Sequence, residues 1–149
     1  RWQFGAGAVL ALVHDSIIVI GLYSLLYGIV PFSMEIGQTF VAAILTIIGY
    51  SINDTVIVFD RIREFKKEYP SRNAKLLYNQ GINRTISRTI NTSLTTVLTL
   101  LVMFLVGVDS IKGFVFSMAI GIVVGTYSSL FVASPITYFL SKNKGETLK

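Results

Sequence analysis

The sequence predicts an all-α membrane protein, a polytopic transmembrane bundle of four spanning helices with a basic cytoplasmic loop. Hydrophobic residues make up 52% of the 149 residues and charged residues only 14%, whereas an ordinary globular domain carries about 25% charged residues. Four long apolar stretches account for most of the chain, so little sequence remains for a separate soluble unit. We therefore expect residues 1–149 to form a single transmembrane domain.

Each apolar stretch is long enough to cross a hydrocarbon core of about 30 Å at a rise of about 1.5 Å per residue. The short break Pro31–Gly37 separates the first stretch from the second, and these two should form a hairpin. A second short break, Gly107–Gly113, separates the third stretch from the fourth. The predicted spans cover residues 4–30, 38–59, 85–106 and 114–140.

Residues 60–84 change abruptly in composition and should form the main aqueous loop. Basic side chains alternate there with a smaller number of acidic ones. Ala74, Leu77, Gly81 and Ile82 recur at helical spacing. That spacing indicates either an amphipathic helix at the membrane surface or an ordinary solvated helix.

The distribution of basic residues predicts the orientation. The central loop and the tail, with Lys142, Lys144 and Lys149, are rich in lysine and arginine, whereas the two opposite loops together contain only Lys112. Because cytoplasmic loops carry the excess of basic residues, both ends of the segment should be cytoplasmic. The formal net charge of +5 is thus a topology signal and does not indicate nucleic acid.

Composition also excludes several kinds of chemistry. The chain has no cysteine, and its one histidine is His14, so a metal cofactor is not expected. No zinc-protease or phosphate-binding motif occurs, which argues against ATP hydrolysis. An intramembrane aspartyl protease would need two facing aspartates; Asp15 and Asp54 could be proposed for that role, but nothing in the sequence around either residue supports it. The chain opens at Arg1 without an initiator methionine, and we interpret it as a portion of a longer protein.

Polar residues inside the spans are the strongest functional candidates. A charge at the centre of a membrane helix costs about 2.5 to 3.5 kcal/mol on insertion scales. We expect His14, Asp15, Asn53, Asp54 and Arg88 to face the interior of the bundle. Asp54 and Arg88 lie at similar depth on consecutive helices, so an ion pair is available, either as part of a proton pathway or as a structural clamp.

Two helix faces carry further patterns. The third span has a polar stripe that suits either a hydrated lining or hydroxyl groups bonded to their own backbone. Its members are Asn91, Thr92, Thr95, Thr96 and Thr99. The fourth span repeats small residues every four positions, which is typical of close helix packing. These residues are Ser117, Gly121, Gly125, Ser129 and Ala133, and Pro135 follows them as a possible kink.

The segment Gly49–Glu64 (GYSINDTVIVFDRIRE) closely resembles the signature of the SecF family. Supporting similarities occur in each of the other spans: Ala11–Asp15, Arg88–Ser93 with Thr95 and Thr96, and Gly121 with Gly125–Ser129 and Ala133. Essentially the whole chain is covered. The resemblance implies the last four of six transmembrane helices in a protein of the resistance-nodulation-division type.

The resemblance also implies a function and partners. SecF proteins pair with SecD, as a separate chain or a fused half, and assist the SecYEG channel in exporting unfolded polypeptide across the bacterial cytoplasmic membrane. The proton motive force is the expected energy source, with no other cofactor, and the expected role is non-enzymatic. Asp54 matches the family's proton-transporting carboxylate, Arg88 its implicated arginine, and Asn53 belongs to the same signature. The alternatives are another proton-driven transporter of this superfamily and a non-catalytic scaffold of the translocon.

Overall fold

The computed structural model describes residues 2–142 of the chain. Within that range the structure is helical, with short connections between helices. In chain order the elements are α1 (Trp2–Leu26), α2 (Gln38–Glu68), α3 (Ala74–Val106), α4 (Asp109–Ser128), a π-helical turn η1 (Ser129–Ala133) and α5 (Ser134–Lys142). The tail lysines Lys144 and Lys149, used above to predict orientation, lie outside the described residues.

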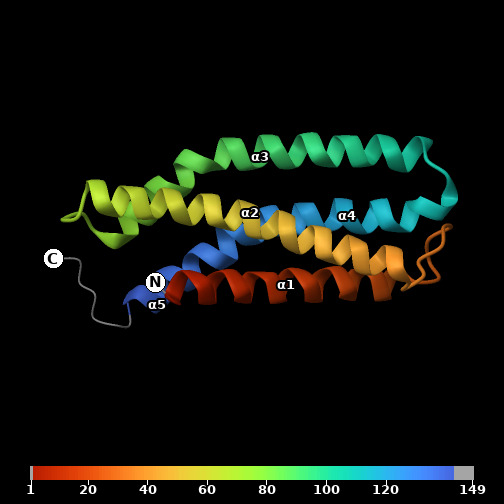
Figure 1. Cartoon of the computed structure of the whole chain (residues 1–149), viewed down its shortest axis with the longest axis horizontal. Helices are drawn as coiled ribbons and strands as arrows, with labels where there is room; N and C mark the ends of the chain where they lie inside the picture. The colour runs from red at the N-terminus through yellow and green to blue at the C-terminus, as the bar shows by residue number, and fades with distance from the viewer. Residues whose placement is uncertain (1, 143–149) are drawn as a thin grey trace.

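Four helical rods run side by side, and the last of them is made of α4, η1 and α5 in succession (Figure 1). α4 packs against α1, α2 and α3, so it is the central helix of the bundle. α1 and α3 lie on opposite sides of α2 and α4 (Figure 1). Each of the four rods is long and apolar enough to cross a membrane. The fold is thus a transmembrane helical bundle, as the sequence predicts.

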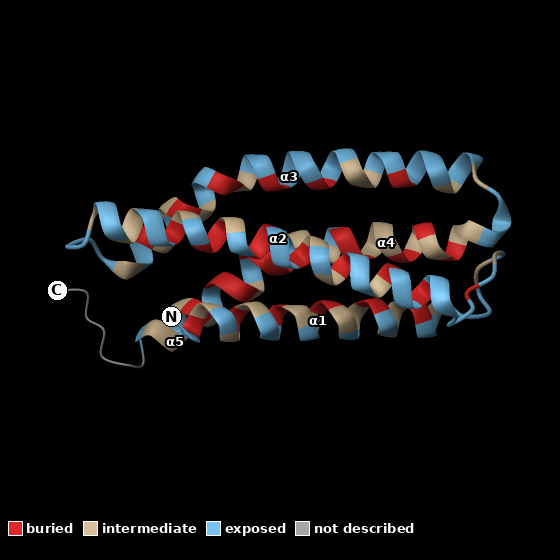
Figure 2. Cartoon of the chain, in the orientation of Figure 1, coloured by how far each residue is buried: buried red, intermediate tan, exposed pale blue. Residues whose placement is uncertain are grey.

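Burial follows the faces that the helices turn toward one another (Figure 2). Ala11, Val58 and Ala133, from α1, α2 and η1, belong to one fully buried cluster. Large apolar side chains such as Leu25 and Leu105 are exposed on the outside. Exposed apolar surface on this scale requires lipid or another protein around the bundle.

The helix ends differ from the predicted span ends. α1 stops at Leu26 because Gly28 adopts a φ of +79°, a left-handed conformation that interrupts the apolar stretch predicted to continue to Val30. α2 continues past Phe59 to Glu68, and α3 already begins at Ala74. The region predicted to be an aqueous loop therefore contains only a short non-helical turn, residues 69–73.

The predicted amphipathic segment around Leu77 and Gly81 forms the first turns of α3 and is not a separate surface helix. Leu77 is buried. A Cβ atom at Gly81 would approach Ile62 of α2, with 2.5 Å to its Cγ1 and 3.2 Å to its backbone nitrogen. The α2–α3 hairpin thus extends as a tightly packed pair beyond the apolar part of the bundle. Asn73 begins α3 by accepting a hydrogen bond from the Lys75 backbone amide at 2.9 Å.

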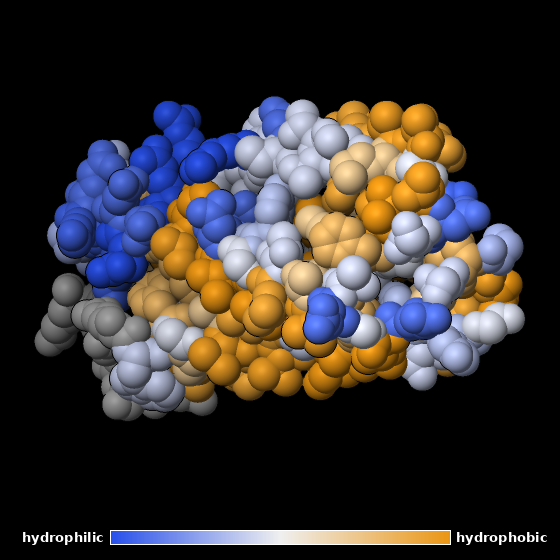
Figure 3. Space-filling view, turned by 45° about the vertical axis from the view of Figure 1, so that its right-hand side comes forward, coloured by the Kyte–Doolittle hydropathy of each residue, from blue (hydrophilic) through white to orange (hydrophobic). Residues whose placement is uncertain are grey.

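The hydrophilic residues gather at the end of the molecule that holds this turn, and a hydrophobic belt covers much of the adjoining flank (Figure 3). The same end holds the start of α1 and the end of α5 (Figure 1). Arg63 and Lys67 are among its exposed basic residues. The opposite end contains the α1–α2 and α3–α4 connections (Figure 1). Charge is therefore distributed unequally between the two ends.

Candidate functional site

The buried carboxylate of Asp15 joins three helices. Its side chain is only 2% exposed. Oδ2 accepts hydrogen bonds from the Ser51 hydroxyl of α2 at 2.6 Å and from the Ser128 hydroxyl of α4 at 2.8 Å. Oδ1 lies 3.1 Å from Nδ1 of the neighbouring His14. Asp15 is therefore a shared hydrogen-bond acceptor, through Oδ2, at the meeting point of α1, α2 and α4.

Two further hydroxyl pairs involve Thr126 and Ser129, which flank the Ser128 partner of this carboxylate within three residues, and one of them extends the polar contacts to α3. Thr55 of α2 and Ser129 are 3.0 Å apart. Ser129 donates its proton to a backbone carbonyl of α4, so Thr55 is the donor of the pair. Ser93 of α3 and Thr126 are 2.5 Å apart. These contacts and those of Asp15 form a polar layer, defined as Asp15, Ser51, Thr55, Ser93, Thr126, Ser128 and Ser129.

The polar layer connects each of α1, α2 and α3 to the central rod. Hydrogen bonds between membrane helices contribute about 0.6 kcal/mol on average and at most about 1.7 kcal/mol. Several such bonds at one level therefore fix the relative rotation of the helices, although each is weak. A hydroxyl group in hydrocarbon without a partner would cost more than the bond contributes.

Asp54 lies among the members of the polar layer on α2, between Ser51 and Thr55, but its environment differs. It is 3% exposed, and among the described residues its buried Oδ2 atom has no hydrogen-bond partner. Buried polar atoms are almost always paired, so an unpaired carboxylate oxygen marks a candidate functional group. Among the site residues predicted from the sequence, Asp54 is therefore the one whose buried, unpaired environment most requires a functional explanation.

Arg88 and Asn53 do not face the interior of this segment, contrary to expectation. Both side chains are exposed. Within the described residues, no hydrogen bond or ion pair joins Arg88 to Asp54, although Arg88 lies within electrostatic range of that carboxylate. The predicted ion pair is therefore not formed in this arrangement, because Arg88 projects from the outer face of α3.

The polar stripe on α3 is mostly exposed, and its threonine hydroxyls are bonded to their own helix. Thr92 and Thr96 donate to the carbonyls of Arg88 and Thr92 at 3.1 and 2.8 Å. Thr95 and Thr99 donate to the carbonyls of Asn91 and Thr95, each at 2.9 Å. Of the two interpretations of the stripe, these bonds match hydroxyl groups satisfied by the backbone.

The small residues of α4 and η1 are buried against the neighbouring helices. A Cβ atom at Gly121 would overlap the Ile47 side chain of α2, and one at Gly125 would lie 3.1 Å from the Ser51 Cβ. Ser129 is buried beside Thr55 of α2, and Ser117 is buried beside Tyr23 of α1. The two glycines let α2 and α4 approach closely, which brings Ser51 and Thr55 within reach of Ser128 and Ser129.

A π-helical turn follows the polar layer directly. η1 covers Ser129–Ala133 and ends next to Ser134, which donates to the Ser129 carbonyl at 3.2 Å. Pro135 lacks an amide hydrogen and crowds the preceding turn, so the wider turn and the serine hydroxyl accommodate it. π-helical turns occur frequently at functional sites. The kink predicted at Pro135 thus takes the form of a widened turn.

Several members of the polar layer are absent from the predicted set of proton-pathway residues. Ser51, Thr55 and Ser128 supply the interhelical hydrogen bonds, yet each is an ordinary small polar residue in an apolar helix. Their signal in the sequence is their position: Ser51 lies one turn from Asp54, and Ser128 adjoins the repeating small residues of α4. Only the packing of the helices shows that they meet Asp15.

Other kinds of site find less support. Among the described residues, no group of three histidine, cysteine, aspartate or glutamate side chains could hold a metal ion. An aspartyl protease needs two facing carboxylates, but both oxygens of Asp15 are engaged with Ser51, Ser128 and His14. Asp15 and Asp54 therefore do not form a catalytic pair in this arrangement.

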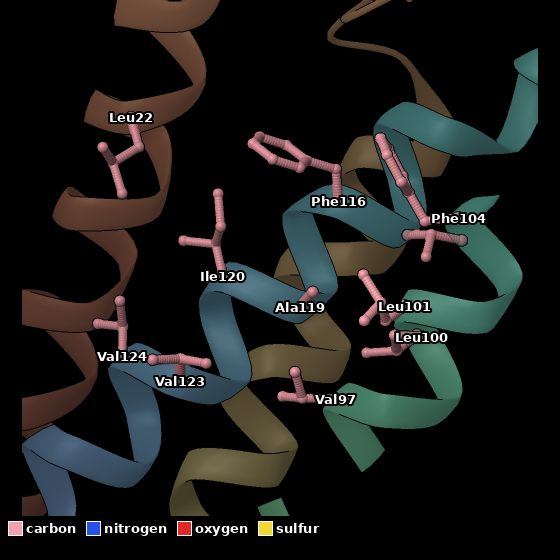
Figure 4. Close-up of a pocket in the computed structure, with 11 residues that line it drawn as sticks. Leu22, Val97, Leu100, Leu101, Phe104, Phe116, Ala119, Ile120, Val123 and Val124 are labelled. Atoms are coloured by element: carbon pink, nitrogen blue, oxygen red, sulfur yellow. The ribbon is translucent and has the colours of Figure 1, made fainter. Parts of the chain in front are cut away.

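An apolar groove of about 500 Å³ lies on the face of α4 between α1 and α3 (Figure 4). Its lining offers dispersion contacts and no hydrogen-bonding side chain, so it does not resemble a site for a polar ligand. The residues that line it are Leu22, Val97, Leu100, Leu101, Phe104, Val115, Phe116, Ala119, Ile120, Val123 and Val124.

These features define the class of protein: a multi-pass membrane protein with a buried polar layer and an unpaired carboxylate at its centre. The chain matches the family model described as protein export membrane protein SecD/SecF, C-terminal, over residues 1–143. The chain therefore belongs to the SecD/SecF protein-export family, as its resemblance to SecF predicts.

Curated relatives carry the name protein translocase subunit SecF. The protein from Rhodothermus marinus is 54% identical over 136 residues, which cover 91% of this chain and 44% of the relative. The protein from Petrotoga mobilis is 45% identical over 149 residues, covering 100% of this chain and 47% of the relative. The chain thus spans about half the length of the curated relatives that it matches.

Solved structures of SecDF share the fold. SecDF from Thermus thermophilus, described as a translocon-associated membrane protein, superimposes with a TM-score of 0.84 at 44% identity. The match covers 95% of this chain and 19% of that one. A SecDF structure in a super-membrane-facing form gives a TM-score of 0.87 at 42% identity, covering 96% of this chain and 19% of the other.

Proposed function

We propose that this chain is the proton-responsive membrane part of a SecD/SecF complex that promotes protein export through the Sec channel. In this role it is a proton-coupled transport subunit and not an enzyme, and the proton gradient is its energy source. Its partners are SecD, or the SecD half of a fused chain, the SecYEG channel, the translocating polypeptide and membrane lipid. It resides in the bacterial cytoplasmic membrane with both ends of this segment cytoplasmic.

One observation carries the proposal: Asp54 is buried in the bundle, and its Oδ2 atom has no hydrogen-bond partner in the part of the chain that the structure describes. A carboxylate in that position can exchange a proton with a change in its hydrogen bonding and charge. Arg88 lies within electrostatic range and supplies a permanent positive charge. Asn53 extends the same signature on the outer face of α2, and His14 with Asp15 forms the adjoining polar group.

The energetic scale of a single proton is sufficient for such a switch. Moving one elementary charge through 100 mV is worth about 2.3 kcal/mol. That amount changes a two-state equilibrium roughly 50-fold, because each 1.4 kcal/mol is a factor of ten. Protonation of Asp54 would alter its attraction to Arg88, and a helix packing that both groups influence would then shift its population.

Asp54→Asn tests the proposal in cells or vesicles that contain the complete complex. Asparagine keeps the size of the side chain but cannot ionise. We expect export of a secreted reporter under a full proton gradient to fall to the rate measured after the gradient is collapsed. The measurement is reporter export with and without the gradient, at equal membrane abundance of the complex.

Asp60→Asn is the matched control, because Asp60 is an exposed carboxylate on the same helix, paired with Arg63 at 3.4 Å. This variant should keep gradient-stimulated export. If Asp54→Asn exports as well as the wild type, Asp54 has no part in proton coupling and the chain acts as a scaffold of the translocon. The interhelical bonds of the polar layer are the observation that favours that second role.

A further inference from the structure

The bundle contains two buried carboxylates with opposite environments. Asp15 is 2% exposed and accepts two hydroxyl hydrogen bonds on Oδ2. Asp54 is 3% exposed, and its Oδ2 has no hydrogen-bond partner within residues 2–142. A group that exchanges a proton during a cycle must change its hydrogen bonding, whereas a group that fixes helices must keep it. The two carboxylates are therefore suited to different tasks.

The hydrogen bonds of Asp15 come from donors on two other helices. Within the described residues, the Ser51 hydroxyl has Oδ2 of Asp15 as its acceptor, at 2.6 Å. The Ser128 hydroxyl lies 2.8 Å from the same oxygen and 3.2 Å from the Gly125 carbonyl of its own helix. A carboxylate oxygen can accept both of these bonds. Oδ2 therefore connects α1 to α2 and α4, while Oδ1 lies beside His14.

These contacts hold the turn of α2 that carries Asp54. Ser51 lies one helical turn before Asp54, and Thr55 follows it directly. Ser51 is bound to Asp15 of α1, and Thr55 is bound to Ser129. Gly125 allows α4 to approach Ser51 so closely that an added Cβ would lie 3.1 Å from the Ser51 Cβ. Both sides of Asp54 are thereby tied to neighbouring helices.

We infer that Asp15 is a positioning residue for Asp54: it serves as the shared acceptor of Ser51 and Ser128, fixes α2 against α1 and α4, and does not carry the transported proton. The inference rests on the proposed function for the role of Asp54. The contacts of Asp15 themselves are independent of that role.

The titratable and charged groups around this level of the bundle come from four helices. Arg88 of α3 lies within electrostatic range of Asp54. Asp15 of α1 binds Ser51, one helical turn before Asp54, and His14 adjoins Asp15. Tyr50 of α2 precedes Asp54 by four residues, and Tyr127 of α4 packs against His14 with ring centroids 5.8 Å apart. Release of α2 from Asp15 would change the distance of Asp54 from each of these groups, and therefore the pH at which Asp54 exchanges its proton.

The test is the pH dependence of carbodiimide labelling at Asp54 in the complete SecD/SecF complex in membranes. A hydrophobic carbodiimide reacts with protonated carboxyl groups, and mass spectrometry of peptides reports each site separately. Asp15→Asn keeps an oxygen that accepts from both serines and removes only the charge, so we expect it to move the labelling midpoint of Asp54 less than a variant without an acceptor does. Asp15→Leu removes the acceptor and should move the midpoint by about one pH unit.

Ser51→Ala and Ser128→Ala keep the inference testable if Asp15→Leu does not assemble. Each removes one donor without adding volume and should also move the midpoint of Asp54. Ser16→Ala is the matched control, because Ser16 adjoins Asp15 but donates to the Leu12 carbonyl of its own helix at 2.9 Å. This control should leave the midpoint unchanged.

Two results would overturn the inference. An unchanged Asp54 midpoint in both serine variants would show that the bonds of Asp15 do not position Asp54. Labelling of Asp15 itself, varying over the same pH range as Asp54, would make Asp15 a second proton carrier. Neither result depends on export. Failure of the proposed function would appear separately, as unchanged export by Asp54→Asn.

Discussion

Replacing Gly121 by leucine is expected to separate α2 from α4 and to prevent stable assembly of the complex. A Cβ atom at this position would already overlap several atoms of Ile47, whose side chain is only 2% exposed. Overpacking of this kind typically costs about 1 to 3 kcal/mol. The cost should be higher here, because separation of the two helices would also break the Thr55–Ser129 contact.

The measurement is the thermal unfolding temperature of the purified complete complex, together with its abundance in membranes. Gly49→Leu is the matched control: Gly49 lies on α2 close to Ile47, but an added Cβ meets no atom within 4 Å. Both substitutions raise helix propensity by the same amount. Equal stability of the Gly121 and Gly49 variants would contradict the close packing of α2 and α4.

The number and order of the helices could be predicted from composition, but their ends could not. Apolar length alone identifies segments that can cross a membrane. Many of the residues between Phe59 and Thr85 are charged. A hydropathy pattern therefore indicates a loop there. Arginine, lysine and glutamate are nevertheless good helix formers, and contacts such as Gly81 against Ile62 stabilise the helices beyond the apolar region. At the other end, the conformation of Gly28 ends α1 inside an apolar run.

The candidate site was predictable in its chemistry and less so in its geometry. Asp15 and Asp54 stand out in apolar helices because burial of a carboxylate needs a reason. Which hydroxyl groups meet Asp15 depends on the rotation of α2 and α4, which no local pattern determines. The expectation that every polar residue faces inward is wrong for Arg88 and Asn53 in this segment. That expectation treats the four helices as a closed unit with one interior.

The exposed position of Arg88 leads to the last prediction. An arginine on the lipid-facing side of a spanning helix costs about 2.5 to 3.5 kcal/mol near the centre. The polar residues that follow it on α3, among them Asn91 and Thr95, are exposed on the same helix. A partner that covers this stripe with polar groups would remove the cost. In the proposed complex, SecD or the SecD half is that partner.

Arg88→Leu is therefore expected to weaken the association of this segment with SecD and to abolish gradient-stimulated export. Loss of the arginine would leave the polar groups of the partner buried and unpaired, which costs about 1 to 3 kcal/mol and corresponds to roughly a 5- to 150-fold loss of affinity. Co-purification of SecD from membranes, measured at increasing detergent concentration, reports the association, and the export assay reports the function.

Lys75→Leu is the matched control, since Lys75 is an exposed basic residue at the start of the same helix. It removes the same charge outside the apolar part of α3 and should leave co-purification unchanged. If Arg88→Leu instead retains or increases the amount of associated SecD, the stripe faces lipid, where leucine is the more favourable residue. Arg88 would then act on Asp54 from the lipid side, and the partner surface would have to lie on another face of the bundle.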